Sequence, residues 1–244
     1  YGAASMPLGV LRRAIGEFPG ARFINAFGQT ETASTITVLP AEDHVLDGSP
    51  AELEIKLKRL TSIGKPLEDV EVRIVDEEGH SVLEGQVGEM VARGRRLMKG
   101  YWLQDEATAE TVKDGWLYTG DLGYADKDGY IYLAGRAKDF IKRGGEMISP
   151  EEVEQVLRSH PELDDAAVIG VPDVEWGEEV RAVVVGRSDR VTEAEIIEFC
   201  RDKMAGYKRP RSVIFVGELP RNVMGKLLKR DLREEFGHPV ENRE

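Results

Sequence analysis

Two regions of different sequence texture meet in residues 135–154, GRAKDFIKRGGEMISPEEVE. The end of this stretch carries a strong helix-start signal, because Ser149 can act as N-cap, Pro150 suits the first helical position and Glu152 completes a capping box. Strand-like patterns precede the stretch and helices return after it, so its place predicts a junction between domains. From about residue 139 to 244 we expect a compact α+β unit of ordinary domain size.

Downstream of the junction, helices alternate with buried strands. Continuous apolar runs predict strands, and a second capping box, formed by Thr192 and Glu195, predicts another helix start. The expected strands are 166–171, 180–185 and 212–216, and the expected last helix is 227–236.

Upstream of the junction, the pattern changes twice. A helix is predicted over 7–17 and a short buried strand over 21–26. Alternating apolar residues then fill 70–133, with a hairpin turn at 128–129, and predict a small antiparallel sheet or partial barrel. The whole chain is therefore expected to be mixed α/β and α+β.

Composition excludes several classes of protein. The chain has 244 residues, 41% of them hydrophobic, which is enough to build packed cores and excludes a disordered tail. A net charge of −12 argues against general binding to nucleic acid or anionic membranes. Cys200 is the single cysteine and no cluster has zinc-ligand spacing, so we expect a reducing cytoplasmic location. No apolar run is long enough to cross a bilayer.

The charge is unevenly distributed. Residues 201–233 contain ten Lys or Arg against three acidic residues, a local excess of +7 within an acidic chain. Such a surface suits a small polyanion, for example a nucleotide or a coenzyme. The alternative is a solvated basic helix face.

One short motif, residues 25–31 (NAFGQTE), combines a glycine turn with an aromatic ring, a hydroxyl and a carboxylate. Phe27 could stack on a base, Thr30 could hydrogen-bond to phosphate and Glu31 could hold Mg²⁺. The alternative is an ordinary polar turn, because short motifs often match by chance.

Three more segments carry residues suited to a nucleotide or an acyl group. In the loop expected at 118–121, an exposed Asp121 could accept both hydrogen bonds of a ribose diol, or it could form an Asx-turn. Gly144 and Gly145 allow close backbone approach to a ligand, or simply a turn. Lys226 could stabilise charge on a phosphate or carboxylate oxygen, or be a surface lysine in the first turn of a helix.

Taken together and in this order, these segments resemble the adenylate-forming superfamily of acyl-CoA synthetases, peptide-synthetase adenylation domains and luciferase-like enzymes. The resemblance covers essentially the whole chain, through GAAS, FGQTE, YTGD, GRAKDFIKRGGEMISPEEVE and PRNVMGKLLKR. The segments GGEMISPEEVE, AAVIGVPDVEWGEE and GYKRPR are most similar to those of a fatty- or aromatic-acyl-CoA ligase.

The resemblance implies a fold and a reaction. Residues 1–137 would be the C-terminal part of the large AMP-binding domain, a partial sheet with a small barrel-like subdomain. Residues 138–244 would be a mobile α+β lid that rotates about a hinge near Lys138. A carboxylate would attack the α-phosphate of ATP to give an acyl-adenylate and pyrophosphate, and the thiol of CoA would then displace AMP. The implied cofactors are ATP, Mg²⁺ and CoA, and the implied role is acid–thiol ligation in fatty acid metabolism.

The resemblance also assigns roles to residues. Thr30 would contact a phosphate oxygen, Glu31 would hold magnesium, and Lys226 would serve adenylation only. The remaining positions would contact ATP or CoA or form the hinge. They are Asn25 and Phe27 on adenine with Gly28 in the turn behind them, Asp121 and Arg136 on the ribose, Lys138 at the hinge, and Gly144, Gly145 and Glu146 in the pantetheine tunnel.

Two departures from the family pattern stand out. Phe27 replaces a more common Tyr, which keeps a stacking face but removes a hydroxyl. The family's phosphate-binding loop, with its own lysine, is not in this chain, and Tyr1 opens what reads as the end of a strand. We therefore expect the C-terminal portion of a longer polypeptide, inactive alone. Two alternatives remain, an enzyme that loads a carrier protein and a non-catalytic adenylate-binding module.

Overall fold

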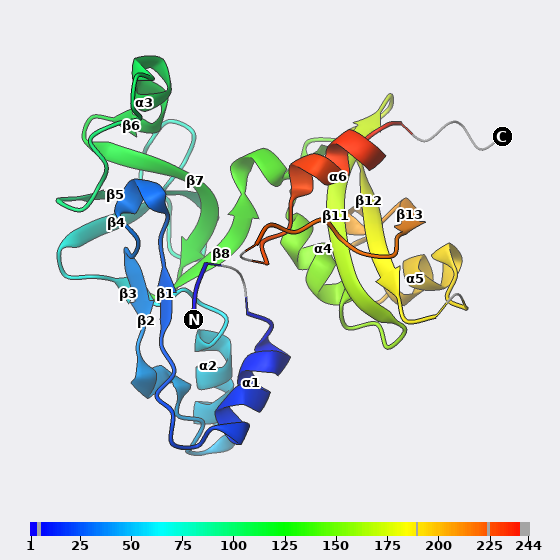
Figure 1. Ribbon diagram of the computed structural model, residues 1–244, viewed down its shortest axis with the longest axis horizontal. Coiled ribbons are helices and arrows are strands. Elements are labelled where there is room, and N and C mark those ends of the chain that lie inside the picture. Colours follow the sequence, from blue (N-terminus) through cyan, green and yellow to red (C-terminus); the bar gives the residue numbers. More distant parts are fainter. Residues whose placement is uncertain (4–5, 189, 224, 240–244) are drawn as a thin grey trace. The chain divides into compact units, whose positions relative to one another are not determined.

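The computed structural model describes residues 1–3, 6–188, 190–223 and 225–239. It separates into two compact units, Tyr1–Ala134 and Gly135–Glu244, each of which is treated by itself (Figure 1). Ala4 and Ser5 of the GAAS segment and Met224 of the last motif lie outside the described residues. None of the described helices combines the length and apolar composition needed to cross a membrane.

The first unit mixes short helices with two antiparallel sheets. Its helices are α1 (Leu8–Glu17), α2 (Pro50–Arg59) and α3 (Asp105–Thr111), with 3-10 turns η1 (Thr30–Thr32) and η2 (Ala41–His44). One sheet has the order β1 (Asn25–Phe27), β2 (Thr37–Leu39), β3 (Lys65–Pro66). The other has the order β4 (Val70–Val75), β5 (Gly88–Gly94), β7 (Trp116–Ala125), β6 (Val112–Lys113), with β8 (Ile131–Arg136) paired to β7.

The sheet pattern expected over 70–133 is confirmed, but the strand expected over 21–26 is wrong in extent. The strand β1 begins only at Asn25, because its pairing with the three-residue strand β2 begins there, and its residues are partly buried. Two apolar clusters hold this unit together. One is centred on Ile36, Ile74 and Met90, and the other is built on Leu11 of α1.

The second unit is a five-stranded sheet with helices on both faces. The sheet order is β10 (Glu146–Ile148), β9 (Ile141–Arg143), β12 (Gly177–Gly186), β11 (Leu163–Asp173), with β13 (Ser212–Phe215) parallel to β12. The helices are α4 (Pro150–Leu157), α5 (Glu193–Phe199) and α6 (Lys229–Phe236), with 3-10 turns η3 (Ala137–Asp139) and η4 (Gly206–Lys208).

The strand β11 explains why its sequence is a continuous apolar run. Side chains alternate between faces along a strand, so Val168 packs with α4 and α5 on one face, and Ala167 and Ile169 pack with α6 on the other. Each face carries its own apolar cluster, and Leu232 anchors α6 in the second of them. The α+β unit expected from the sequence is therefore confirmed.

Two helix starts differ from the prediction. Ser149 caps α4, its Oγ accepting from the Glu152 N–H at 3.3 Å, but Glu152 does not complete the box, because both its carboxylate oxygens accept from Lys208 at 2.7 Å. The full box at Thr192 is confirmed. The last helix begins at Lys229 instead of 227, because Leu227 pairs with Arg221 instead.

Candidate active site

The FGQTE motif forms a sharp exit from β1 into η1. Gly28 has no room for a side chain, because a Cβ there would lie 1.5 Å from the carbonyl oxygen of Ser34. Gln29 caps the turn, its N–H donating to Thr32 Oγ1 at 2.9 Å while the Thr32 hydroxyl donates back to the Gln29 carbonyl at 2.9 Å. Thr30 is exposed at the surface of this fixed turn.

The same glutamine joins this motif to the YTGD segment. Its Nε2 donates to the Thr119 carbonyl at 3.2 Å and to Asp121 Oδ2 at 3.3 Å, across about ninety residues of sequence. The segment is a bulge within β7 and not the predicted loop, because residues 119–121 face the single residue Met90 of β5. Asp121 was expected to be exposed, and the structure instead leaves only 6% of it accessible.

Glu31 is positioned by a distant tyrosine. The phenol of Tyr101 donates to Glu31 Oε1 at 2.7 Å, and the Glu31 carbonyl accepts from the Met98 N–H at 2.7 Å. The hydrogen bond to this carboxylate, followed by burial, raises the pKa of Tyr101. One carboxylate on a partly exposed turn fits Mg²⁺, which proteins often bind through one or two carboxylates together with substrate phosphates and water. No group of three or more His, Cys, Asp or Glu is arranged as a metal site among the described residues.

The residues expected on adenine also have structural contacts. The Asn25 amide donates to the Ser62 carbonyl at 3.4 Å, and Phe27 packs against the apolar cluster of Ile36 and Met90. Both are only partly buried, so each keeps an accessible face.

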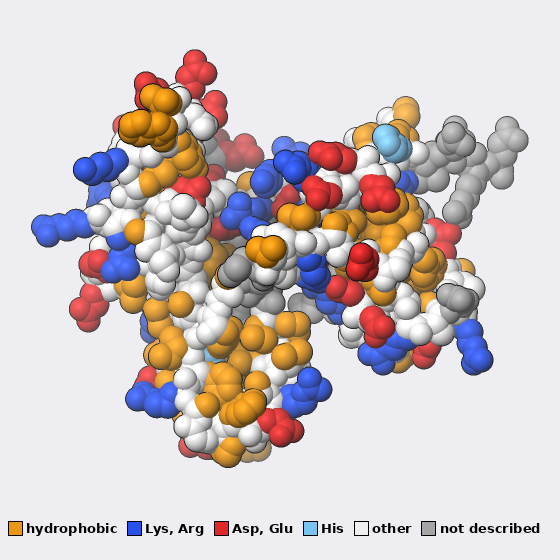
Figure 2. All heavy atoms as spheres, viewed as in Figure 1, with side chains coloured by type: hydrophobic (Ala, Val, Ile, Leu, Met, Phe, Trp, Pro, Cys, Tyr) orange, Lys and Arg blue, Asp and Glu red, His pale blue; other side chains and the backbone are white. Residues whose placement is uncertain are grey.

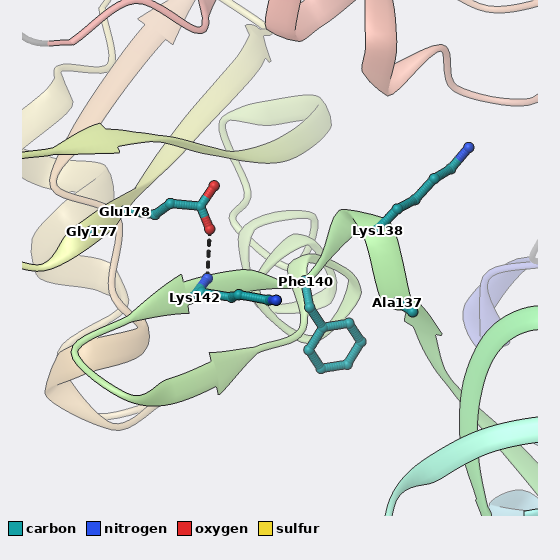
Figure 3. A pocket seen from close by; sticks show the side chains of 6 residues that line it. All are labelled: Ala137, Lys138, Phe140, Lys142, Gly177 and Glu178. Carbon is teal, nitrogen blue, oxygen red and sulfur yellow. Dashed lines mark hydrogen bonds between the residues drawn. The ribbon is translucent and has the colours of Figure 1, made fainter. Parts of the chain in front are cut away.

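The predicted hinge lies in the second unit. Arg136 ends β8 and Lys138 lies in the middle of η3, with its side chain exposed. A hollow of about 420 Å³ is lined here by Ala137, Lys138, Phe140, Lys142, Gly177 and Glu178. Figure 3 shows the Lys138 side chain extending away from Lys142, whose N–H donates to Glu178 at 2.6 Å.

The two glycines expected in the pantetheine tunnel form the tight turn between β9 and β10. Gly144 and Gly145 have φ of +58° and +88°, as the two-residue turns that match the twist of paired strands require. A Cβ on Gly144 would lie 2.7 Å from the Trp176 ring, whereas Gly145 is open. Glu146 follows the turn and is exposed.

Lys226 is exposed on a loop, not in the first turn of a helix. Its N–H donates to Asn222 Oδ1 and its carbonyl accepts from the Asn222 N–H, both at 2.9 Å. The residues expected in one site thus fall into two sets. Asn25, Phe27, Gly28, Thr30, Glu31 and Asp121 belong to the first unit, and Arg136, Lys138, Gly144, Gly145, Glu146 and Lys226 belong to the second.

The basic excess over 201–233 is largely matched by carboxylates. Six of its cations pair with acidic residues outside the segment: Arg201 with Glu198, Lys208 with Glu152, Arg221 with Asp165, Lys229 with Glu151 and Glu154, Arg230 with Glu234, and Arg233 with Asp139. Figure 2 shows Lys and Arg side chains mixed with Asp and Glu around α6. Internal ion pairing therefore explains much of this basic excess, for which the sequence alone predicts a polyanion surface or a solvated helix face.

Sequence reasoning missed two residues of the first unit. Gln29 stands inside a quoted motif, but its contact with Asp121 depends on strand pairing far along the chain. Tyr101 is 70 residues from Glu31 and has no local signal for that contact.

Two family models match this chain, one in each of its two compact units. The model of the AMP-binding enzyme family matches residues 1–102, and that of the AMP-binding enzyme C-terminal domain matches residues 152–226. A 2-succinylbenzoate–CoA ligase of Bacillus cereus (strain Q1) is 42% identical over 208 residues, which is 85% of this chain and 40% of that protein. The chain thus spans about two fifths of the length of the curated relatives it matches.

Solved structures of similar proteins cover nearly the whole chain. The o-succinylbenzoate CoA synthetase of Bacillus subtilis, in complex with its acyl-adenylate intermediate, is 34% identical with a TM-score of 0.81, over 95% of this chain and 45% of that one. ATP-bound MatB of Rhodopseudomonas palustris is 33% identical with a TM-score of 0.84, over 97% and 44%. The amide bond synthetase McbA of Marinactinospora thermotolerans is 35% identical with a TM-score of 0.83, over 97% and 46%. With both family models matched in order and these structures superposing on both units, the chain belongs to the AMP-binding, or adenylate-forming, enzyme family.

Proposed function

We propose that this chain is the C-terminal portion of an ATP-dependent acyl-CoA ligase. The observation that supports it best is the contact of Gln29 with the buried Asp121, which joins the FGQTE segment, with its Glu31, to the YTGD segment. The names of the relatives support an aromatic acid, such as 2-succinylbenzoate, over a fatty acid. The single buried Cys200 supports a cytoplasmic location.

The proposed reaction has two steps. A carboxylate oxygen of the acid attacks the α-phosphorus of ATP and pyrophosphate leaves, which gives an acyl-adenylate. The sulfur of CoA then attacks the acyl carbon, the thiol proton is released to solvent, and AMP leaves with the C–O electron pair. The acid is already ionised at neutral pH, so the first step depends on positioning and on cations near the phosphate rather than on a general base.

Each proposed residue has a simple task. Asn25 and Phe27 would hold the adenine, Asp121 and Arg136 the ribose hydroxyls, and Thr30 a phosphate oxygen. The following set completes the assignment: Gly28 keeps the turn tight, Lys138 is the hinge, and Gly144, Gly145 and Glu146 line the path of pantetheine. The Lys226 ammonium would neutralise charge that develops on the phosphate and the leaving group during adenylation. Magnesium, when bound by Glu31 and the phosphates, supplies further charge neutralisation.

The first test is AMP release by the complete polypeptide that contains this chain. The panel holds 2-succinylbenzoate and other aromatic acids, fatty acids and amino acids, each with and without CoA. CoA-dependent AMP release with a thioester product supports the proposal and identifies the acid class. Adenylate without thioester would assign the acyl group to a carrier-protein thiol or, as the similarity to an amide bond synthetase suggests, to an amine. No AMP release with any acid would favour a non-catalytic binding module.

A second test separates the two steps. Lys226→Ala should slow adenylate formation by about 100-fold or more, the range seen when a charge-stabilising donor is removed. Thioester formation from supplied acyl-adenylate should change little, because Lys226 serves the first step only. Rapid-quench assays of each half-reaction measure both rates. Equal losses in the two steps would contradict the assigned role.

A further inference from the structure

The loop that carries Lys226 is closed at its base by backbone pairing. Arg221 and Leu227 pair as an antiparallel bridge, and Asn222 exchanges two hydrogen bonds with Lys226. Gly225, next to the lysine, has a φ of +78°. Lys226 is thus exposed on a short loop, and the position of its side chain depends on the contacts that the two ends of the loop make.

The first end is tied to β11. Arg221 Nη2 donates to Asp165 Oδ2 at 2.5 Å, and the same guanidinium donates from Nη1 to the Gly225 carbonyl at 2.7 Å. Burial tends to raise the pKa of Asp165, but the hydrogen bond from Arg221, the Ala166 N–H and the charges of Arg158 and Arg221 together lower it. Asp165 is therefore held as a carboxylate that fixes the start of the loop.

The second end is tied to α4. The first residue of α6, Lys229, places its Nζ 3.0 Å from Glu154 Oε1 and 3.1 Å from Glu151 Oε1. The Lys229 side chain is 11% exposed and that of Glu154 is 5% exposed, so their ion pair is shielded from water. Glu154 Oε1 also accepts from the Val168 N–H at 3.0 Å. The loop therefore ends on a buried, well-bonded carboxylate.

One arginine joins the two ends. Arg158 lies 3.1 Å from Asp165 through its Nε and 3.4 Å from Glu154 through its Nη2, and Nη2 also donates to the Ala166 carbonyl at 2.7 Å. The charged groups form a chain that we name the ion-pair circuit, Arg221–Asp165–Arg158–Glu154–Lys229. Burial raises the pKa of Glu154, and the cations Lys229 and Arg158 act against that rise. Removal of the charge of Asp165 or of Glu154 would take one partner from Arg158 and one from the cation at an end of the loop, Arg221 or Lys229.

We infer that the ion-pair circuit positions Lys226 for adenylation, with Asp165 and Glu154 as positioning residues that never touch the substrate. The inference rests on the proposed function of Lys226. Fixing α6 alone does not need the circuit, because Leu232 is fully buried beneath that helix and Arg233 donates to Asp139 at 2.8 Å. The additional effect of the ion-pair circuit is to fix the positions of both ends of the loop that carries Lys226. A displacement of about 1 Å at a reacting group can cost on the order of 100-fold in rate.

The test uses three variants in the complete polypeptide. Asp165→Asn releases the first end and Glu154→Gln weakens the second while keeping an acceptor for Val168. Asp164→Asn is the matched control, because it makes the same change one residue away, where Asp164 pairs with the exposed Arg187 outside the circuit. Three quantities are measured: adenylate formation with 2-succinylbenzoate or the fastest acid of the panel, thioester formation from supplied acyl-adenylate, and hydrogen exchange in peptides covering 220–228.

We expect Asp165→Asn and Glu154→Gln to slow adenylate formation by about 10-fold or more, with thioester formation within about twofold of wild type. Hydrogen exchange in 220–228 should accelerate in both variants and stay unchanged in Asp164→Asn. If Glu154→Gln does not fold, Asp165→Asn decides, because its side chain lies nearer the surface. Unchanged adenylation, or equal losses in both half-reactions, would overturn the inference. Lys226→Ala separates the two ideas, since full adenylation in that variant would overturn the proposed function instead.

Discussion

At the scale of single residues, Tyr101 is the contact that most directly controls Glu31. Its phenol donates to one carboxylate oxygen, Oε1, at 2.7 Å, which limits rotation of the carboxylate. Tyr101→Phe keeps the ring and removes this bond. We expect the magnesium concentration needed for half-maximal adenylation to rise about 10-fold, because residues that orient metal ligands typically affect metal affinity by 10- to 100-fold.

Titration of the adenylation rate with MgCl₂ measures this effect, and direct binding of Mn²⁺, followed by its electron spin resonance in the presence of ATP, gives a readout apart from activity. Tyr118→Phe is the control, because that tyrosine belongs to the same unit and its ring lies under the Lys113 ammonium, whereas the Glu31 carboxylate accepts from Tyr101. Equal metal affinity in Tyr101→Phe and wild type would show that Tyr101 does not orient Glu31 for metal binding.

At the scale of elements, two glycines of the first unit are needed for different reasons. Gly120 lies in the bulge of β7 with φ of +71° and open space around it, so Gly120→Ala meets only backbone strain of about 1–2 kcal/mol. Gly28→Ala places a Cβ 1.5 Å from the Ser34 carbonyl oxygen, and the turn must open. We expect Gly28→Ala to lower the free energy of unfolding by about 3 kcal/mol, the upper end of the range for an overpacked side chain.

Thermal unfolding of the complete polypeptide measures both variants, and hydrogen exchange in peptides from residues 1–134 assigns the loss to the first unit. If Gly120→Ala is as unstable as Gly28→Ala, the bulge does not accommodate a side chain at residue 120, although the space around it is open.

The same elements show what a sequence can and cannot predict. The capping box at Thr192 and the two-faced strand β11 follow from residues close together in the chain, and both were predicted. The bulge at 119–121 was missed because it exists only through pairing with β5. The box at Ser149 is incomplete because Lys208, 56 residues later, takes the glutamate. The helix α2 was missed although Ser49, Pro50 and Glu52 form a local capping signal.

The candidate site follows the same rule. Residue types within each motif were readable, so Glu31, Asp121 and Lys226 could be named as candidates. Their environments were not readable, because each depends on a distant partner: Tyr101 for Glu31, Gln29 for Asp121 and, through the ends of its loop, Asp165 for Lys226. Long-range hydrogen bonds of this kind follow from topology and carry no periodic signal.

At the scale of the whole molecule, the proposed function requires the second unit to serve two half-reactions, which makes the backbone near Lys138 decisive. Lys138 is exposed in the 3-10 turn η3, so its side chain is not needed for packing. Proline fixes φ near −65° and pushes the preceding residue toward extended conformations. Proline at the hinge therefore removes rotation about φ and restricts residue 137, so one of the two backbone states becomes less accessible. Lys138→Pro should slow one half-reaction at least about 10-fold more than the other.

Lys138→Ala separates backbone from charge, because it removes the ammonium and leaves φ free. Both half-reactions of this control should stay within about twofold of wild type, in contrast to the proline variant. The rates are measured as adenylate formation from acid and ATP, and as thioester formation from supplied acyl-adenylate and CoA. If Lys138→Pro slows the two steps equally, or neither, the conformational change does not pass through Lys138, and the turn η3 only connects two units that work without reorienting there.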